Sequence, residues 1–254
     1  PDLRGIDVAL LYQRDLFKLL SSRSISIPPL KQYRPTRDLL HVSGLLLTGD
    51  TLDVFVCHLP SRSGGAKESE SYRLYAAHIL RMEVDSIMSI RSLPQVIIMG
   101  DFNDYPTNQS IQKILEAEAP PVTTNNLAST TGSTNFSTVA PSSLKLYHLL
   151  ARKAKSKDFG SYKYRGEWGL LDHLIVSGTL LNQSNHFFTS EEKANVCLLP
   201  FLLKDDEKYG DKEPFRTYKG MKYQGGVSDH LPIYADFELS LIHISEPTRR
   251  RGIS

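Results

Sequence analysis

The chain has 254 residues, of which 40% are hydrophobic and 23% are charged. This is the profile of a soluble globular protein with one large core or two small ones. The formal net charge of +2 is too small to indicate nucleic-acid binding by itself, and much of the excess comes from Arg249–Arg251. No hydrophobic run is long enough to span a bilayer. The chain opens at Pro1 rather than methionine, so the absence of a signal peptide leaves the compartment open.

The two cysteines lie in apolar stretches, at Cys57 and Cys197. Two buried thiols are therefore a better interpretation than a disulfide framework or a metal site.

The first half of the chain predicts strands around one long helix. Residues 5–12 predict a central strand, and the apolar runs 39–47 and 52–59 predict a hairpin. Residues 68–91 predict a helix, because apolar residues recur at helical spacing. Its opposite face carries charges that we interpret as solvated, namely Arg73, Arg81, Glu83 and Asp85. A buried strand is predicted at residues 96–98.

The second half is richer in loops. The pattern predicts a short helix at residues 107–118, a long polar loop at 119–143, a helix with a basic end at 144–157, a strand at 172–177 and a last strand at 233–237.

The stretch Gly100-Asp101-Phe102-Asn103 follows the buried strand at once. Residues two apart on an extended chain point to the same side, so the oxygens of Asp101 and Asn103 would face one pocket. Hard cations such as Mg²⁺ prefer ligands of this kind. The alternative is a polar turn that ends the strand.

Other polar residues also stand at the ends of predicted core strands. They are Arg4, His58, Asp172, Asp229 and His230. Ligands bind beyond the strand ends of open sheets, so this pattern predicts one shared site. Carboxylates for a cation, histidines for proton transfer and an arginine for a phosphate oxygen fit phosphate-ester hydrolysis. For His58 taken alone, local hydrogen bonding is the simpler explanation.

Residues 162–168 combine tyrosines and a tryptophan with lysine and arginine. Such a cluster can stack on bases or sugars and contact phosphates, or it can pack a strand pair. The sequence leaves both open.

These motifs together resemble the endonuclease/exonuclease/phosphatase superfamily, which includes deoxyribonuclease I. The matching stretches are the arginine-led strand at Arg4, His58-Leu59-Pro60-Ser61, Gly100-Asp101-Phe102-Asn103, the strand led by Asp172, and Ser228-Asp229-His230-Leu231-Pro232. The resemblance implies an α/β fold, a four-layer α/β/β/α sandwich of two mixed sheets with outer helices. It also implies a Mg²⁺ or Mn²⁺ cofactor and in-line attack by water on phosphorus.

The same resemblance assigns a role to each residue. Asp172 would orient His230, and that pair with His58 would act in proton transfer or stabilise transition-state charge. Asp101 and Asn103 would position water and metal, Asp229 would add to the metal site, and Arg4 would bind the substrate phosphate. The family's earlier metal-binding Asn and Glu have no counterpart here, so we expect missing first strands and weak or absent turnover by this chain alone.

We expect the domain to occupy residues 1–238. Residues 239–254 resemble a translated sequencing adapter and are left out of fold reasoning. A nuclease or related phosphodiesterase is the leading hypothesis, with nucleic acid or another phosphodiester as partner and a monomeric state. The alternatives are a phosphatase or phosphodiesterase on phosphoinositide, sphingomyelin or small-molecule phosphates, and a non-catalytic binding module. The low net charge argues against tight duplex binding.

Overall fold

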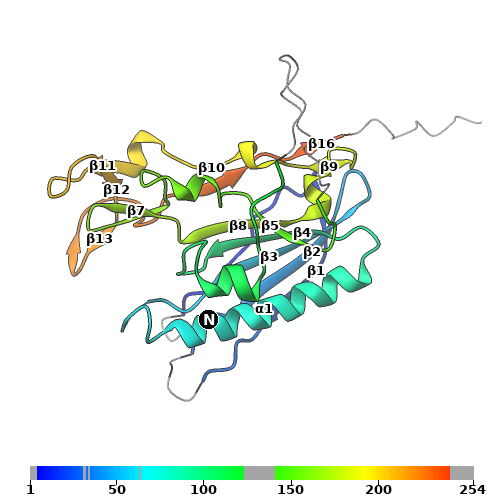
Figure 1. Ribbon diagram of the computed structural model, residues 1–254, viewed down its shortest axis with the longest axis horizontal. Helices are drawn as coiled ribbons and strands as arrows, with labels where there is room; N and C mark the ends of the chain where they lie inside the picture. The colour runs from blue at the N-terminus through cyan, green and yellow to red at the C-terminus, as the bar shows by residue number, and fades with distance from the viewer. Residues whose placement is uncertain (1–4, 31–32, 34, 63, 123–140, 241–254) are drawn as a thin grey trace, which may run out of the picture.

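The computed structural model describes residues 5–30, 33, 35–62, 64–122 and 141–240. Arg4 and the end of the predicted tail therefore lie outside the described residues. The centre of the fold is a six-stranded mixed sheet with the order β1-β2-β3-β4-β8-β5 (Figure 1). Its strands are β1 (Phe17–Ile25), β2 (Leu39–Leu46), β3 (Thr51–His58), β4 (Gln95–Asp101), β8 (Asp172–Ser177) and β5 (Leu146–His148). The pair β3–β4 is parallel and the other neighbours are antiparallel.

The helix α1 (Glu70–Ile90) covers one face of this sheet. Its apolar stripe, which includes Ala77, Leu80 and Val84, packs in one core with Phe55 of β3 and Ile98 of β4. Burial of that stripe, rather than intrinsic helix propensity, provides most of such a helix's stability.

The opposite face carries short two-stranded ladders instead of a second helix layer in the described chain. They are β10 (Ala194–Val196) with β15 (Ile233–Ala235), and β9 (Phe187–Phe188) with β16 (Glu238–Leu239). Val196 and Leu231 join Leu174 and Val176 of β8 in a second core. The predicted mixed α/β class with layered sheets is confirmed, and the second layer is assembled from short pairs.

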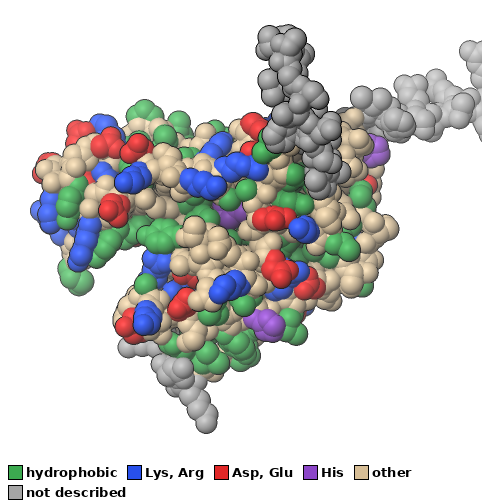
Figure 2. Space-filling model, in the orientation of Figure 1, with side chains coloured by type: hydrophobic (Ala, Val, Ile, Leu, Met, Phe, Trp, Pro, Cys, Tyr) green, Lys and Arg blue, Asp and Glu red, His purple; other side chains and the backbone are tan. Residues whose placement is uncertain are grey.

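Three hairpins extend to the left in Figure 1 and form what we call the hairpin arm, residues 161–169 and 203–227. They are β6 (Tyr162–Tyr164) with β7 (Glu167–Gly169), β11 (Leu203–Asp205) with β12 (Lys212–Pro214), and β13 (Tyr218–Lys219) with β14 (Lys222–Tyr223). A notch separates this arm from the body of the molecule (Figure 2), and the end of β4 points toward it (Figure 1).

The short helical turns are η1 (Ser110–Ile114), a π-helix, and the 3₁₀ turns η2 (Lys153–Lys155), η3 (Gly178–Leu181), η4 (Glu191–Lys193) and η5 (Pro200–Leu202). None of the described helices is both long and apolar enough to cross a membrane. Neither cysteine forms a disulfide, and Cys57 is buried.

Three sequence predictions differ from the structure. Residues 5–12 belong to no strand ladder of the described chain, and the sheet edge is formed instead by β1, whose mixed polar sequence is exposed along most of its length. The helix predicted at 144–157 is replaced by β5 and a turn, because Leu146, Tyr147 and His148 are all buried beside β8. The helix predicted at 107–118 is reduced to the single turn η1.

Candidate active site

Three neighbouring strands bring their polar ends to one edge of the sheet. His58 lies opposite Asp101 in the parallel pair β3–β4, and Asp101 lies opposite Asp172 in the antiparallel pair β4–β8. Gly100 permits this close approach, since it has a φ of +136° and a Cβ there would lie 1.9 Å from the carbonyl oxygen of Cys57. The strand register therefore places His58, Asp101 and Asp172 side by side.

His230 reaches the same edge from the far end of the chain. Its Nδ1 lies 2.7 Å from Oδ2 of Asp172, and that oxygen also accepts a hydrogen bond of 2.5 Å from the Ser161 hydroxyl. Burial opposes the charge on His230, but Asp172, Asp101 and Asp229 outweigh it and raise the histidine's pKa to about 9. Burial also acts to raise the pKa of Asp172, yet His230 and Ser161 bring it below its ordinary value. The pair is therefore an imidazolium held by a carboxylate at neutral pH.

Asp101 has the opposite electrostatics. Burial and the nearby carboxylate of Asp172 raise its pKa to about 6, although His230 and the backbone N–H of Asn103 act against the rise. Nε2 of His58 lies 3.4 Å from its Oδ2, and the N–H of Asn103 donates to its Oδ1 at 2.8 Å. Two carboxylates on adjacent strands thus have pKa values shifted in opposite directions, a pattern associated with functional sites.

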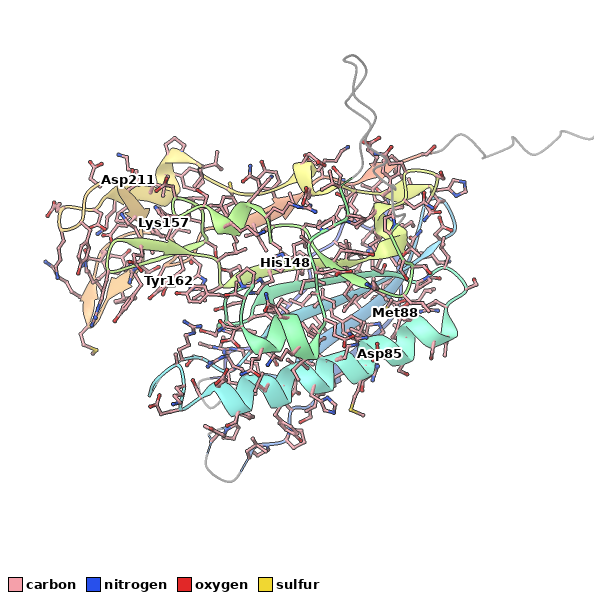
Figure 3. The ribbon with its side chains drawn as sticks, viewed as in Figure 1. Asp85, Met88, His148, Lys157, Tyr162 and Asp211 are labelled. Atoms are coloured by element: carbon pink, nitrogen blue, oxygen red, sulfur yellow. The ribbon has the colours of Figure 1, made fainter. Side chains whose placement is uncertain are left out.

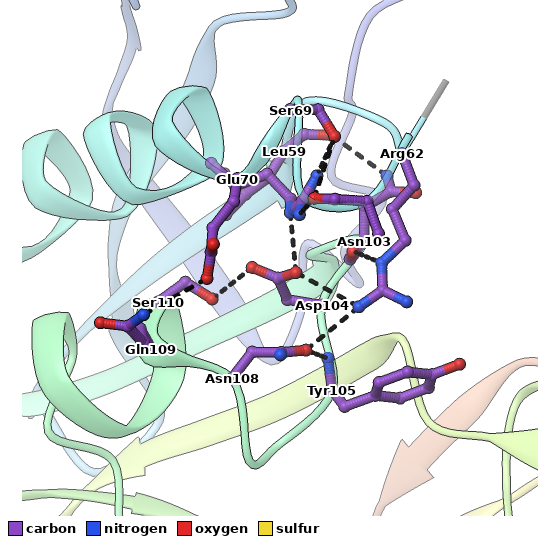
Figure 4. Close-up of polar contacts among 12 residues, drawn as sticks. Leu59, Arg62, Ser69, Glu70, Asn103, Asp104, Tyr105, Asn108, Gln109 and Ser110 are labelled. Carbon is purple, nitrogen blue, oxygen red and sulfur yellow. Dashed lines mark hydrogen bonds and ion pairs between the residues drawn. The ribbon is translucent and has the colours of Figure 1, made fainter. Parts of the chain in front are cut away.

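Asn103 leaves the strand in a left-handed conformation with a φ of +52°. Its Nδ2 donates to the carbonyl of Leu59 at 3.1 Å, and its own carbonyl accepts from Nε of Arg62 at 2.7 Å (Figure 4). The amide nitrogen is a donor only, so Oδ1 is the side-chain atom that can accept from water or bind a cation.

A buried charge network fixes the loop on which Asn103 sits. Oδ1 of Asp104 accepts from Nε of Arg73 at 2.7 Å, and its Oδ2 accepts from the Ser110 hydroxyl at 2.7 Å (Figure 4). Asp104 is 2% and Arg73 is 1% exposed, so the prediction that Arg73 belongs to a solvated helix face was wrong. The guanidinium of Arg62 also reaches Asp104, at 3.4 Å, and it lies over the ring of Tyr105.

A family model described as Endonuclease/Exonuclease/phosphatase family matches residues 1–239. The chain belongs to this family. No curated protein matched the chain.

Solved structures of the same fold share little sequence with this family member. D. rerio TDP2 complexed with single strand DNA product is 15% identical with a TM-score of 0.50, and the match covers 89% of this chain and 70% of that chain. The mannosyl-6-phosphatase of Bacteroides thetaiotaomicron VPI-5482 is 16% identical with a TM-score of 0.51 and coverages of 89% and 68%. The human Nocturnin catalytic domain with bound sulfate is 19% identical with a TM-score of 0.47. The match covers 90% of this chain but spans 62% of that domain.

The residues of this family chain also provide a donor set that suits a hard divalent cation. One ligand atom from each of Asp101, Asp172 and His230 lies within 4.8 Å of the others. Asp172 is already neutralised by His230, however, so the groups left for a cation are Asp101, the Oδ1 of Asn103 and the exposed Asp229. The raised pKa of Asp101 is the behaviour of a carboxylate that is buried and lies near other carboxylates, and a bound cation would lower it.

A second pair of histidines, which the sequence did not predict, links the paired strands β5 and β8. Nε2 of His148 lies 2.5 Å from Nδ1 of His173, and Nε2 of His173 lies 2.8 Å from the carbonyl oxygen of Asp104. The N–H of Leu150 donates to Nδ1 of His148, so both rings must carry their proton on Nε2. His148 is labelled in the interior in Figure 3. Burial holds the pKa of His148 well below its ordinary value and lowers that of His173 to about 4, so both rings are neutral supports.

Proposed function

We propose that this site hydrolyses phosphate esters with the help of Mg²⁺ or Mn²⁺, and that the substrate is a phosphodiester. The observation that carries the proposal is the convergence of His58, Asp101 and Asp172 on three adjacent strands, with His230 paired to Asp172 at 2.7 Å. Family membership supports the reaction class, and the substrate is our inference.

We infer that two groups share the proton transfer. His230 is held through Nδ1, so its protonated Nε2 is the atom that can donate to a phosphoryl oxygen or a leaving group. Asp101, when ionised, can accept a proton from an attacking water, and His58 at 3.4 Å can share that proton. Asp172 and Ser161 hold the orientation of His230.

The cation would be held by Asp101, Asn103 and Asp229. It would neutralise developing negative charge on the phosphoryl group. Arg4, which lies outside the described residues, remains our proposed ligand for a phosphate oxygen.

The test is hydrolysis of bis-p-nitrophenyl phosphate by the purified chain with Mg²⁺, with Mn²⁺ and with EDTA, beside p-nitrophenyl phosphate. We expect slow turnover of the diester that requires metal and disappears in the His230→Ala variant. Turnover that persists in EDTA or in that variant would refute the proposal. Faster turnover of the monoester would favour the phosphatase alternative.

The rate also tests the expectation that metal ligands are missing. A rate near that of a full-length family member would show that this chain carries a complete metal site.

A further inference from the structure

The hairpin β6–β7 presents different chemistry on its two faces. The ammonium of Lys163 is buried against the rest of the arm, where it donates to the carbonyls of Gly210 and Lys212 and lies 3.2 Å from Asp206. Successive strand residues point to opposite faces, so Tyr162 and Tyr164 face away from that anchor. The rings of Tyr162 and Tyr164 are nearly parallel, at 12°, with centroids 6.4 Å apart.

This pair of rings continues directly from the candidate active site. The ring of Tyr162 lies 4.9 Å from that of His230, and the two residues form an isolated antiparallel bridge. Tyr162 lies on the underside of the hairpin arm, above the notch (Figure 3). Tyr164 is 55% exposed, and the guanidinium of Arg165 lies 5.2 Å from its centroid. A row of aromatic rings therefore leads outward from His230.

Arg216 adds a cation beside this row. The N–H of Val227 donates to the carbonyl of Phe215, and Gly226 packs on the backbone of residues 215 and 216. This contact places Arg216 alongside the segment that leads into Asp229 and His230. Burial raises the pKa of the Tyr162 phenol, and the nearby charge of Arg216 acts against that rise.

The guanidinium of Arg216 is incompletely satisfied. Its Nε is buried and has no hydrogen-bond acceptor among the described residues. A buried donor without an acceptor costs free energy, and an anionic ligand that accepts from it would remove that cost. Cations in such positions suit an anionic ligand, because a guanidinium matches the geometry of a phosphate.

We propose that Arg216 and the Tyr162–Tyr164 face form a subsite for the nucleotide next to the scissile phosphate. Arg216 binds a phosphate oxygen of that nucleotide, and Tyr164 stacks on its base. The inference rests on the proposed function, since it names the substrate class as single-stranded nucleic acid.

The extent of the surface favours an oligonucleotide over a small sugar phosphate. A sugar phosphate needs one anion site beside His230, whereas here aromatic rings and cations continue along the arm. The neighbouring hairpin, residues 216–224, carries Arg216, Lys219 and Lys222 with two exposed tyrosines, and Lys219 lies 4.0 Å from Glu213 of β12. A basic surface with interleaved aromatic rings is how proteins bind single strands without strong sequence preference.

The test measures binding in EDTA, where hydrolysis is blocked, by the fluorescence anisotropy of a labelled oligothymidylate and of an abasic oligomer of equal length. We expect Tyr164→Ala to lower the affinity for oligothymidylate about fivefold or more and to leave the affinity for the abasic oligomer unchanged. Arg216→Gln should lower the affinity for both oligomers and reduce the slope of log K against the logarithm of the salt concentration by about 0.7. The matched controls Tyr234→Ala and Lys113→Gln, which change an exposed ring and an exposed cation on other elements, should leave binding unchanged.

Thermal unfolding separates a binding role from a structural role. Arg216→Gln should keep or raise the melting temperature, because it removes a buried donor without an acceptor. A lower melting temperature with unchanged binding would overturn the assignment. If Tyr164→Ala lowers the affinity for both oligomers equally, the base subsite is overturned. If neither variant changes binding, the whole proposal is overturned. Because binding is measured without metal, failure of hydrolysis alone would count against the proposed function and not against this subsite.

Discussion

The two sides of the candidate site are held in place by different means. On the β4 side, Asp104, Arg73 and Ser110 form a buried network of short hydrogen bonds under Asn103. On the side of the hairpin arm, His230 lies on an irregular segment and depends on Asp172, Ser161 and a contact with Tyr162. Changes on the first side should therefore act mainly on stability, and changes on the second mainly on activity.

The largest effect is expected from His230→Ala. Loss of a positioned proton donor should lower kcat by about 10²- to 10⁴-fold. Steady-state kinetics with bis-p-nitrophenyl phosphate measure this, and His78→Ala, at an exposed position on α1, is the control. A tenfold effect or less would show that His230 is not central to turnover.

Asp104→Ala should destabilise the fold strongly. It leaves the Arg73 cation buried without its carboxylate, which costs about 3–5 kcal/mol. Urea unfolding measures the loss. Asp85→Ala, which breaks an ion pair whose carboxylate is 53% exposed, should cost less than about 1 kcal/mol. Equal losses in the two variants would mean that the buried network does not fix the β4 side.

The paired histidines predict acid sensitivity. Their pKa values are lowered on folding, so the unfolded chain binds more protons below about pH 6.5, and stability falls as the pH drops toward 4. For His173 alone the loss approaches about 3 kcal/mol across that range. NMR titration should find no protonation of either ring between pH 8 and pH 5. A titration near pH 6.5 in the folded protein would contradict the buried tautomer chain.

The last prediction is a gain of stability in Asp101→Asn. The folded pKa of about 6 lies above the unfolded value, so ionised Asp101 destabilises the metal-free fold at pH 8, and this penalty disappears below about pH 4. A rise of about two pKa units corresponds to about 3 kcal/mol, so the variant should be more stable by up to that amount at pH 8 and equally stable at pH 4. Unfolding curves at both pH values measure whether the variant gains or loses stability. A loss of stability at pH 8 would contradict this electrostatic assignment.

Sequence patterns predicted the elements that hold the site, because their apolar periodicity matches their burial. The hairpin β2–β3, helix α1 and strands β4 and β8 all follow this rule, as do the strand ends at His58, Asp101 and Asp172. The roles given to His58, Asp101, Asn103, Asp172, Asp229 and His230 remain predictions, and the structure shows only that they lie near one another.

The supporting network was not predictable for a physical reason. A charged residue is usually solvated, so Arg73 on a helix and Asp104 after a turn gave no signal that they would be buried together. Ser161 and His148 depend on contacts between segments far apart in sequence. The buried strand β5 could not be distinguished from a helix, because a run of three apolar or aromatic residues fits both patterns.

The most direct test of convergence is a crystal structure with Mn²⁺ and phosphate, with the metal located by anomalous scattering. We predict Mn²⁺ bound to the carboxylate of Asp101 and a phosphate oxygen hydrogen-bonded to Nε2 of His230. Mn²⁺ and phosphate bound away from both residues, or His230 separated from Asp172, would contradict the account.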